Sequence, residues 1–183
     1  MTNPIEIHTP RLLLKSITPG IILGLFEKKS KEEIMLFFNT DDDGYDHLRQ
    51  MRDKGMETHR ISLFYFLLLD KETKSVIGQC AFHTWNKTHD RAELFYGLKN
   101  DSDKRKGFMS EALPEILDFG FNTLGLHRVE ALTAAWNTAS ITLLERHGFT
   151  KEGTMREDYK VSGKHENSEC YSLLKREWHK AEE

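Results

Sequence analysis

Cysteine and proline are scarce in this sequence of 183 residues, which contains two cysteines and four prolines. Cys80 and Cys170 are too few for a disulfide framework, so we expect reduced thiols and a cytoplasmic protein. Residues 1–10 lack the apolar core of a signal peptide, which agrees with that location. The longest apolar run, residues 63–69, is far too short to cross a bilayer. These absences exclude a disulfide-rich secreted scaffold and a membrane-spanning helix.

Neither sign of charge dominates: the sequence contains 26 Lys and Arg residues and 29 Asp and Glu residues, which gives a formal charge of −3. No overall basic field therefore attracts nucleic acid or an anionic membrane, and any anionic ligand must be held locally. The sequence also lacks the Walker A and Gly-x-Gly-x-x-Gly nucleotide motifs, and it lacks Cys-x-x-Cys and His-x-x-x-His spacings. We expect no metal site and no nucleic-acid or membrane partner.

Hydrophobic periodicity predicts an α+β fold with a mixed, mainly antiparallel sheet of six to seven strands flanked by helices. Strands are predicted at residues 5–17, 61–69, 76–84, 91–98, 128–134, 149–159 and 167–174. Helices are predicted near residues 21–26, 30–38, 48–51, 112–121 and 138–147. Repeats, low-complexity tracts and linkers are missing, so residues 1–183 are predicted to form one domain.

The loop between the fourth predicted strand and the next helix carries the strongest local signal. It reads Lys104, Arg105, Lys106, Gly107, Phe108, Met109 and Ser110. Backbone N–H groups and the positive end of a helix dipole converge at such a junction and favour an anion, while glycine permits close approach. On spacing alone, a solvated basic turn explains the loop equally well.

A series of motifs in a fixed order changes that balance. The series comprises residues 92–98 (AELFYGL), 105–113 (RKGFMSEAL), 126–131 (LHRVEA), 137–140 (NTAS), 144–149 (LERHGF) and 152–153 (EG). It resembles the GNAT superfamily of N-acetyltransferases, in the branch of the ribosomal-protein N-acetyltransferases RimJ and RimL. The resemblance covers most of the chain, from the Thr-Pro-Arg-Leu motif at residues 9–12 to residues 171–178 (YSLLKREW). It implies the GNAT, or acyl-CoA N-acyltransferase, fold with acetyl-CoA as co-substrate.

The resemblance also implies where coenzyme A is held. The family's acyl-CoA loop reads Gln/Arg-x-x-Gly-x-Gly/Ala, and Lys104, Gly107 and Met109 occupy its three marked places here, two of them departing from the consensus. Amides of the loop would hold the diphosphate, and strand residues would pair with the pantetheine arm beside residues of the later helix. The implied contacts outside the loop are Phe95, Tyr96, Gly97, Leu98, Asn137, Ser140, Leu143 and Leu144. Helix capping explains Asn137 and Ser140 equally well.

For catalysis, an amine must lose its proton before it attacks a thioester, so the site needs a base. Glu93 is the candidate, because it precedes Lys104 by the eleven residues that separate base and loop in GNAT histone acetyltransferases. A solvent-facing strand glutamate is the alternative. The tyrosine that many GNAT enzymes use as general acid is replaced by Leu144, so Ser140 is the candidate substitute. The alternatives that stay open are Tyr96, Tyr159 and Tyr171.

The expected activity is acetyl transfer to a primary amine by direct attack in a ternary complex. The acceptor is left open between the N-terminal α-amine of a protein and a small molecule such as a polyamine or an aminoglycoside. Two other classes also stay open: a non-catalytic acyl-CoA-binding sensor, because of Leu144, and a nucleotide-dependent phosphotransferase that uses the same loop. A homodimer is compatible with each of them.

Overall fold

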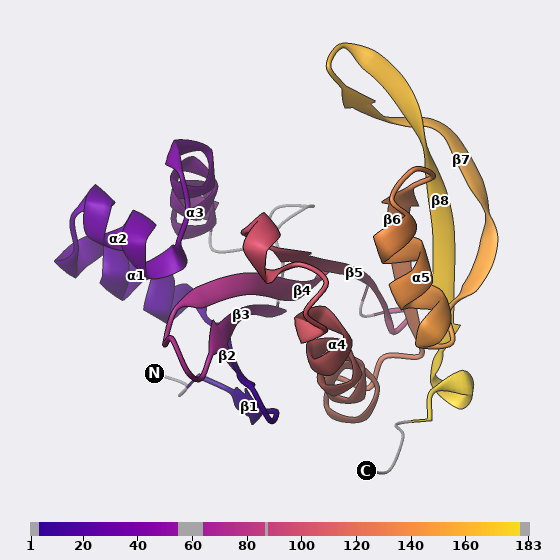
Figure 1. Cartoon of the computed structure of the whole chain (residues 1–183), viewed down its shortest axis with the longest axis horizontal. Coiled ribbons are helices and arrows are strands. Elements are labelled where there is room, and N and C mark those ends of the chain that lie inside the picture. Colours follow the sequence, from indigo (N-terminus) through magenta and orange to yellow (C-terminus); the bar gives the residue numbers. More distant parts are fainter. Residues whose placement is uncertain (1–3, 55–63, 87, 180–183) are drawn as a thin grey trace. The chain divides into compact units, whose positions relative to one another are not determined.

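The structure is a computed structural model that describes residues 4–54, 64–86 and 88–179. Its helices and strands are shown in Figure 1 and follow the chain in this order: β1 (Glu6–His8), β2 (Leu12–Ile17), α1 (Pro19–Lys28), α2 (Lys31–Phe38), α3 (Asp42–Lys54), β3 (Phe64–Asp70), β4 (Val76–Asn86), β5 (Arg91–Leu98), α4 (Phe108–Asp118), β6 (Arg128–Ala134), α5 (Thr138–Arg146), β7 (Thr150–Val161) and β8 (Lys164–Leu174).

The chain divides into two compact units. The first unit comprises Met1–Thr84 and Phe95–Glu115, and the second comprises Trp85–Leu94 and Ile116–Glu183. Both β5 and α4 contribute residues to each unit. Among the described residues the hydrogen-bonded strand order is β1-β2-β3-β4-β5-β6-β8-β7. The α+β class and the mainly antiparallel sheet are therefore confirmed.

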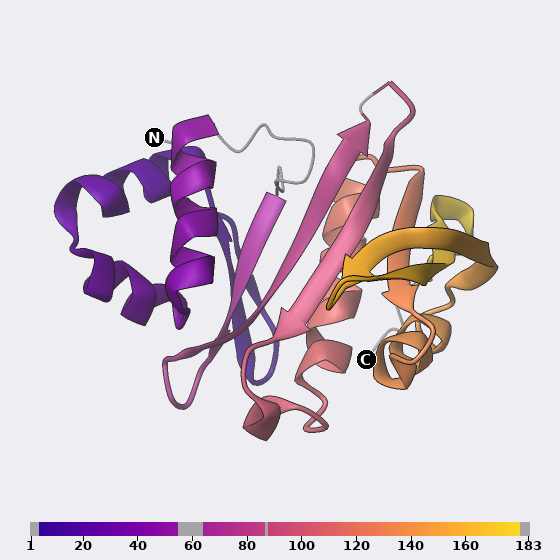
Figure 2. The same cartoon turned by 90° about the horizontal axis from the view of Figure 1, so that it is seen from above.

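In the first unit, β1 to β4 form an antiparallel array, and helices α1 to α3 lie together beside it (Figure 2). Strand β3 is nearly continuous in apolar residues because both of its faces are buried: Tyr65 and Leu67 alternate with Phe66 and Leu68. Tyr65 and Leu67 share a core with side chains of all three helices, including Ile22, Ile34, Phe38, Leu48 and Met51.

Helix α2 begins as its sequence predicts. The Ser30 hydroxyl accepts a hydrogen bond from the N–H of Glu33 at 3.2 Å, and the Glu33 carboxylate accepts one from the N–H of Ser30 at 2.9 Å. This reciprocal pair satisfies two N–H groups that the helix leaves without partners. The capping box is confirmed.

The first predicted strand, residues 5–17, is wrong as a single element, because it is divided into β1 and β2. The N–H of Thr9 donates to the Leu12 carbonyl, and the N–H of Leu12 donates to Thr9 Oγ1, each at 3.0 Å. These bonds close a turn that also contains Pro10, which has no N–H to donate. The described chain therefore has eight strands in place of the six to seven predicted.

The second unit contains β6, β8 and β7 as an antiparallel set, together with α5. Helix α5 is followed by Gly148 at φ +82°, the left-handed residue that the sequence predicts after its C-terminus. The hairpin of β7 and β8 is longer than predicted, since β7 ends at Val161 and β8 begins at Lys164, whereas the predicted strands end at 159 and begin at 167. The pairing of β8 with β6 begins only at Ser168. The end of this hairpin therefore extends past β6 (Figure 1).

In the described part of the chain, no helix combines the length and the apolar composition that crossing a membrane requires.

Gly78 of β4 should be intolerant of a side chain. A Cβ there would lie 2.7 Å from the carbonyl oxygen of Gly97 and 3.0 Å from Leu98 Cδ2, so the backbone of β5 would have to move. We expect Gly78→Ala to lower the free energy of unfolding in urea by about 1–3 kcal/mol. Gly97→Ala is the matched control, because a Cβ at Gly97 meets nothing within 4 Å. Equal stability of the two variants would contradict the packing described for this strand pair.

Candidate active site

The loop that follows β5 starts from an anchored strand end. The N–H of Lys99 donates to the Ile77 carbonyl at 2.9 Å, which holds the end of β5 beside β4. A short 3₁₀ turn, Asp101–Asp103, comes next, and α4 begins at Phe108. The intervening residues 104–107 therefore connect two regular elements over a short distance.

Two residues of this loop have left-handed backbone conformations: Arg105 at φ +62° and Gly107 at φ +81°. Successive N–H groups in a turn of this kind can converge on one side and form an anion-binding nest. Within the described residues, no hydrogen bond engages the backbone N–H groups of residues 106–110. Those of residues 108–110 also belong to the first turn of α4, where a helix leaves its N–H groups without partners. This donor set fits a diphosphate.

Among the loop side chains, Phe108 and Met109 are buried, each with 8% of its surface exposed. They are therefore available to a ligand through their amides and not through their side chains. This agrees with a methionine at the last marked place of the acyl-CoA loop.

The three cations of the loop differ in how they are paired. Lys104 Nζ lies 2.6 Å from Asp101 Oδ1, and Lys106 Nζ lies 4.0 Å from Asp103 Oδ1. The hydrogen bond from Lys104 holds the pKa of Asp101 below its ordinary value. Arg105 has no hydrogen bond or ion pair with the described residues, so it is the loop cation whose charge is most available to an anion.

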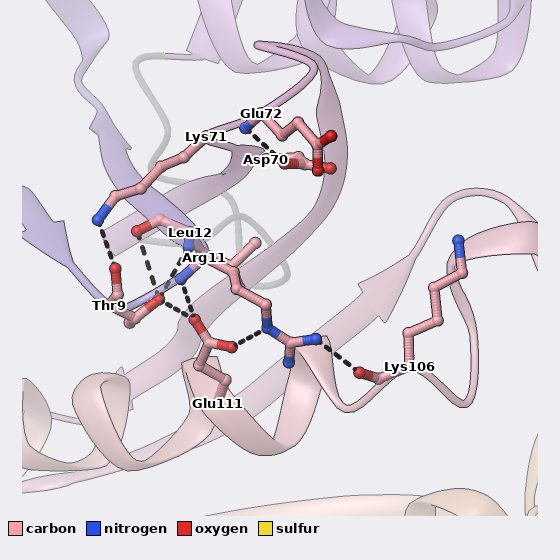
Figure 3. Close-up of polar contacts among 8 residues, drawn as sticks. All are labelled: Thr9, Arg11, Leu12, Asp70, Lys71, Glu72, Lys106 and Glu111. Carbon is pink, nitrogen blue, oxygen red and sulfur yellow. Dashed lines mark hydrogen bonds and ion pairs between the residues drawn. The ribbon is translucent and has the colours of Figure 1, made fainter.

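Behind the loop, Arg11 and Thr9 from the turn between β1 and β2 contact the start of α4 (Figure 3). Arg11 Nε donates to Glu111 Oε2 at 2.6 Å, and the N–H of Arg11 donates to Glu111 Oε1 at 2.7 Å. The hydroxyl of Thr9 donates to the same carboxylate. Burial raises the pKa of Glu111, but the hydrogen bonds from Thr9 and Arg11 outweigh it and leave the pKa below its ordinary value.

Sequence reasoning did not assign a role to Thr9, Arg11 or Glu111. The Thr-Pro-Arg-Leu motif at residues 9–12 and Glu111 both occur in the motifs that carry the family resemblance. Their contact joins positions about one hundred residues apart, which no local pattern reveals.

In the second unit, Glu93 lies on β5 opposite Glu130 of the parallel strand β6. The register of these strands comprises three residue pairs and ends at Glu93, so the predicted pantetheine-binding residues 95–98 lie beyond it. Of those residues, Phe95 is exposed, whereas Tyr96, Gly97 and Leu98 are partly buried.

Glu130 belongs to a network of ion pairs in the second unit. Arg91 Nη1 and Arg128 Nε lie 2.7 Å and 3.0 Å from Glu130 Oε1. Arg128 also forms a bidentate pair with Glu152 at 2.7 Å and 2.6 Å, and the Ser172 hydroxyl donates to Glu152 at 2.8 Å. These bonds, that of Arg128 first, lower the pKa of Glu152 to about 2. Burial raises the pKa of Glu130, but Arg128 and Arg91 outweigh it, so this carboxylate is also held ionised.

The predicted residues of α5 occupy different environments. Asn137 caps the helix, since its Oδ1 accepts a hydrogen bond from the N–H of Ser140 at 3.2 Å. Ser140 and Leu143 are partly buried, and Leu144 is fully buried with 0% exposure. A buried leucine has no group that could protonate a thiolate.

The predicted site residues are divided between the two compact units. Residues 95–98 and 104–110 belong to the first unit, and Glu93 and the α5 residues belong to the second.

Comparison with known proteins tests the family directly. Residues 11–150 match the model of the acetyltransferase (GNAT) domain. The chain belongs to this family. Among its relatives, an uncharacterized N-acetyltransferase p20 of Bacillus licheniformis is 34% identical over 94% of this chain and 97% of its own length. A spermidine N(1)-acetyltransferase of Vibrio cholerae is 23% identical over 90% of this chain and 93% of its own length.

A solved structure shows the same fold. The crystal structure of a ribosomal-protein-S5-alanine acetyltransferase from Vibrio fischeri superposes with a TM-score of 0.71 at 19% identity, covering 96% of this chain and 99% of the other. The predicted GNAT fold and acetyltransferase class are confirmed. Among the described residues, no group of three or more His, Cys, Asp or Glu side chains is placed to hold a metal ion.

The Glu152 pair makes a prediction about acid stability. A carboxylate whose pKa falls to about 2 on folding stabilises the native state above its ordinary pKa of 4.5 and loses this contribution as the pH falls toward 2. We expect Glu152→Gln to be less stable than the wild type at pH 7 by about 1 kcal/mol or less, because the Glu152 side chain is 42% exposed and solvent screens the pair. The deficit should shrink between pH 4.5 and pH 2.

Urea unfolding at a series of pH values measures this difference. Glu72→Gln, on the exposed turn between β3 and β4, is the control and should track the wild type. A deficit for Glu152→Gln that stays constant across the acid range would show that Arg128 does not hold this carboxylate ionised.

Proposed function

We propose that this acetyltransferase uses acetyl-CoA and transfers the acetyl group to a primary amine by direct attack in a ternary complex. The observation that carries the proposal is the loop before α4, with left-handed residues at Arg105 and Gly107 and unengaged N–H groups over residues 106–110. A diphosphate without a metal needs such a fixed set of donors. Family membership supplies the acetyltransferase class.

In this proposal the chain holds coenzyme A at three places. The amides of residues 106–110 bind the diphosphate, and Arg105 adds a cation that no carboxylate neutralises by direct pairing among the described residues. Backbone groups of residues 95–98 pair with the pantetheine arm like an added strand, beyond the end of the β5–β6 register. Asn137, Ser140 and Leu143 contact the same arm from α5.

For the chemical step, acetyl-CoA supplies an activated thioester, and the chain must supply a base and charge stabilisation. Glu93 takes the proton of the ammonium acceptor, directly or through one water. A backbone N–H within residues 96–98 stabilises the negative charge that develops on the carbonyl oxygen. Ser140 is the candidate donor to the departing sulfur, since Leu144 has no polar group. A thiolate is a fair leaving group, so this donor has a small task.

The acceptor is an amine of one of two classes. The RimJ/RimL-like motifs favour the N-terminal α-amine of a protein, whereas the relative named as a spermidine acetyltransferase, which aligns over most of both chains, favours a polyamine. Acceptor choice depends on contacts outside the shared cofactor loop. Release of coenzyme A thiol should therefore be measured with ribosomal-protein N-terminal peptides, spermidine and an aminoglycoside in parallel.

Ligand-induced stabilisation tests the cofactor. We expect coenzyme A at 100 times its Kd to stabilise the protein by about 2.7 kcal/mol, and ATP at equal concentration to stabilise it much less. Thermal unfolding with each ligand measures the difference. Protection by ATP alone would support a phosphotransferase. Tight coenzyme A binding without turnover on any amine would support the acyl-CoA sensor that the buried Leu144 keeps as the second candidate.

Glu93→Gln tests the base. We expect kcat/KM for the amine to fall about 10²–10⁴-fold, because proton removal is lost, while the Kd of coenzyme A stays within twofold of wild type. Steady-state kinetics from pH 6 to pH 10 measure the loss, and Glu72→Gln serves as the control. An unchanged kcat/KM with an unchanged alkaline rise would remove Glu93 from the mechanism.

A further inference from the structure

We propose that Arg11 is a positioning residue for the diphosphate-binding loop: it fixes the peptide group between Lys106 and Gly107 and so aims the N–H of Gly107 at the ligand. The inference rests on the proposed coenzyme A site. It concerns a residue more than ninety positions away in the sequence, on the turn between β1 and β2.

Arg11 contacts residues on both sides of Gly107 in the sequence, and its bonds to Lys106 and Glu111 are drawn in Figure 3. Its Nη1 donates to the Lys106 carbonyl at 2.9 Å, and its guanidinium lies over the Phe108 ring at 4.6 Å from the centroid. Its Nε and its backbone N–H both donate to Glu111, one helical turn further along α4. One side chain thus contacts the residue before Gly107, the residue after it and the first turn of the helix.

Peptide geometry converts the carbonyl contact into a directional effect. A trans peptide group is planar, and its C=O and N–H point in opposite directions. Because Arg11 holds the Lys106 carbonyl, the N–H of Gly107 points away from the guanidinium. Rotation of this group would break the bond to Arg11, so Arg11 restricts the direction of one of the unengaged amides, that of Gly107.

The fit between Arg11 and Gly107 is close. A Cβ on Gly107 would lie 3.4 Å from Arg11 Nη2, which is van der Waals contact, and the φ of +81° would strain any side chain there. Gly107 therefore lets the guanidinium lie against the backbone of the loop.

Arg11 differs from the loop cation Arg105 because the charge of Arg11 is neutralised by a direct pair with Glu111. Glu111 pairs with Arg11, and its pKa lies below the ordinary value because hydrogen bonds from Thr9 and Arg11 outweigh the effect of burial. The pair is close to neutral overall, so Arg11 adds little net attraction for a phosphate. It also compensates a carboxylate that would otherwise repel an anion from the start of α4. The contribution of Arg11 is therefore geometric.

Arg11→Met is the decisive variant, because methionine keeps apolar contact with Phe108 but cannot donate to Lys106 or Glu111. We expect the Kd of coenzyme A, measured by calorimetry, to rise roughly tenfold. With the amine that the wild type uses, KM for acetyl-CoA should rise similarly and kcat should stay within about twofold. Turnover of S-acetylpantetheine, which lacks the diphosphate, should not change.

Two companion variants and one control complete the experiment. Arg11→Lys keeps the charge but not the two-pronged geometry, so it should rescue binding only in part. Glu111→Gln should also weaken coenzyme A binding. The double variant Arg11→Met with Glu111→Gln should lose less binding free energy than the two single variants together, because both residues hold the same loop conformation. Lys15→Met breaks an ion pair with Glu6 at 2.9 Å on the same β1–β2 hairpin and should leave the Kd unchanged.

The outcomes separate the inference from the proposed function. A wild-type protein that does not bind coenzyme A would overturn the proposed function itself. A wild type that binds, with an Arg11→Met variant that binds equally well, would overturn only the role of Arg11. Equal losses with acetyl-CoA and S-acetylpantetheine would show that Arg11 merely stabilises the fold. If Arg11→Met does not fold, Arg11→Lys and Glu111→Gln answer the same question.

Discussion

The peptide group between Lys106 and Gly107 is the point on which the candidate site depends. Its orientation is constrained from both sides: Gly107 has a left-handed backbone, and Arg11 holds the Lys106 carbonyl at 2.9 Å. The neighbouring N–H groups begin α4 and have no intrahelical partner. A chain with a net charge of −3 thereby concentrates donors for an anion in a few consecutive amides.

Each of the two units contains a compensated ion pair that joins distant segments. Arg11 with Glu111 in the first unit, and Arg128 with Glu152 in the second, each join distant segments through charge-assisted bonds below 3 Å. In each pair, hydrogen bonds hold the pKa of the carboxylate below its ordinary value. Such pairs orient strands and helix ends without adding net charge. Within the loop itself, Lys104 and Lys106 are also paired with carboxylates, so Arg105 is the loop cation without a direct carboxylate partner among the described residues.

Local signals predicted most regular elements correctly because their causes are local. The capping box at Ser30 and Glu33 and the left-handed Gly148 depend on bonds and backbone angles within a few residues. The first strand was predicted wrongly because Thr9 closes a turn through its side chain, which alternation of apolar residues does not reveal. Residues 61–63 of the next predicted strand lie outside the described residues, and its remainder is confirmed as part of β3.

For the site, the amino-acid sequence alone determined the family, the order of its motifs and the place of the loop, since these depend on residue identity and spacing. Tertiary structure alone decided which groups hold that loop. The contacts of Arg11 with Lys106 and Glu111 span 95 and 100 residues, and they form only when the β1–β2 turn packs against the start of α4. Such contacts leave no periodic trace along the chain, because they depend on how distant segments fold together.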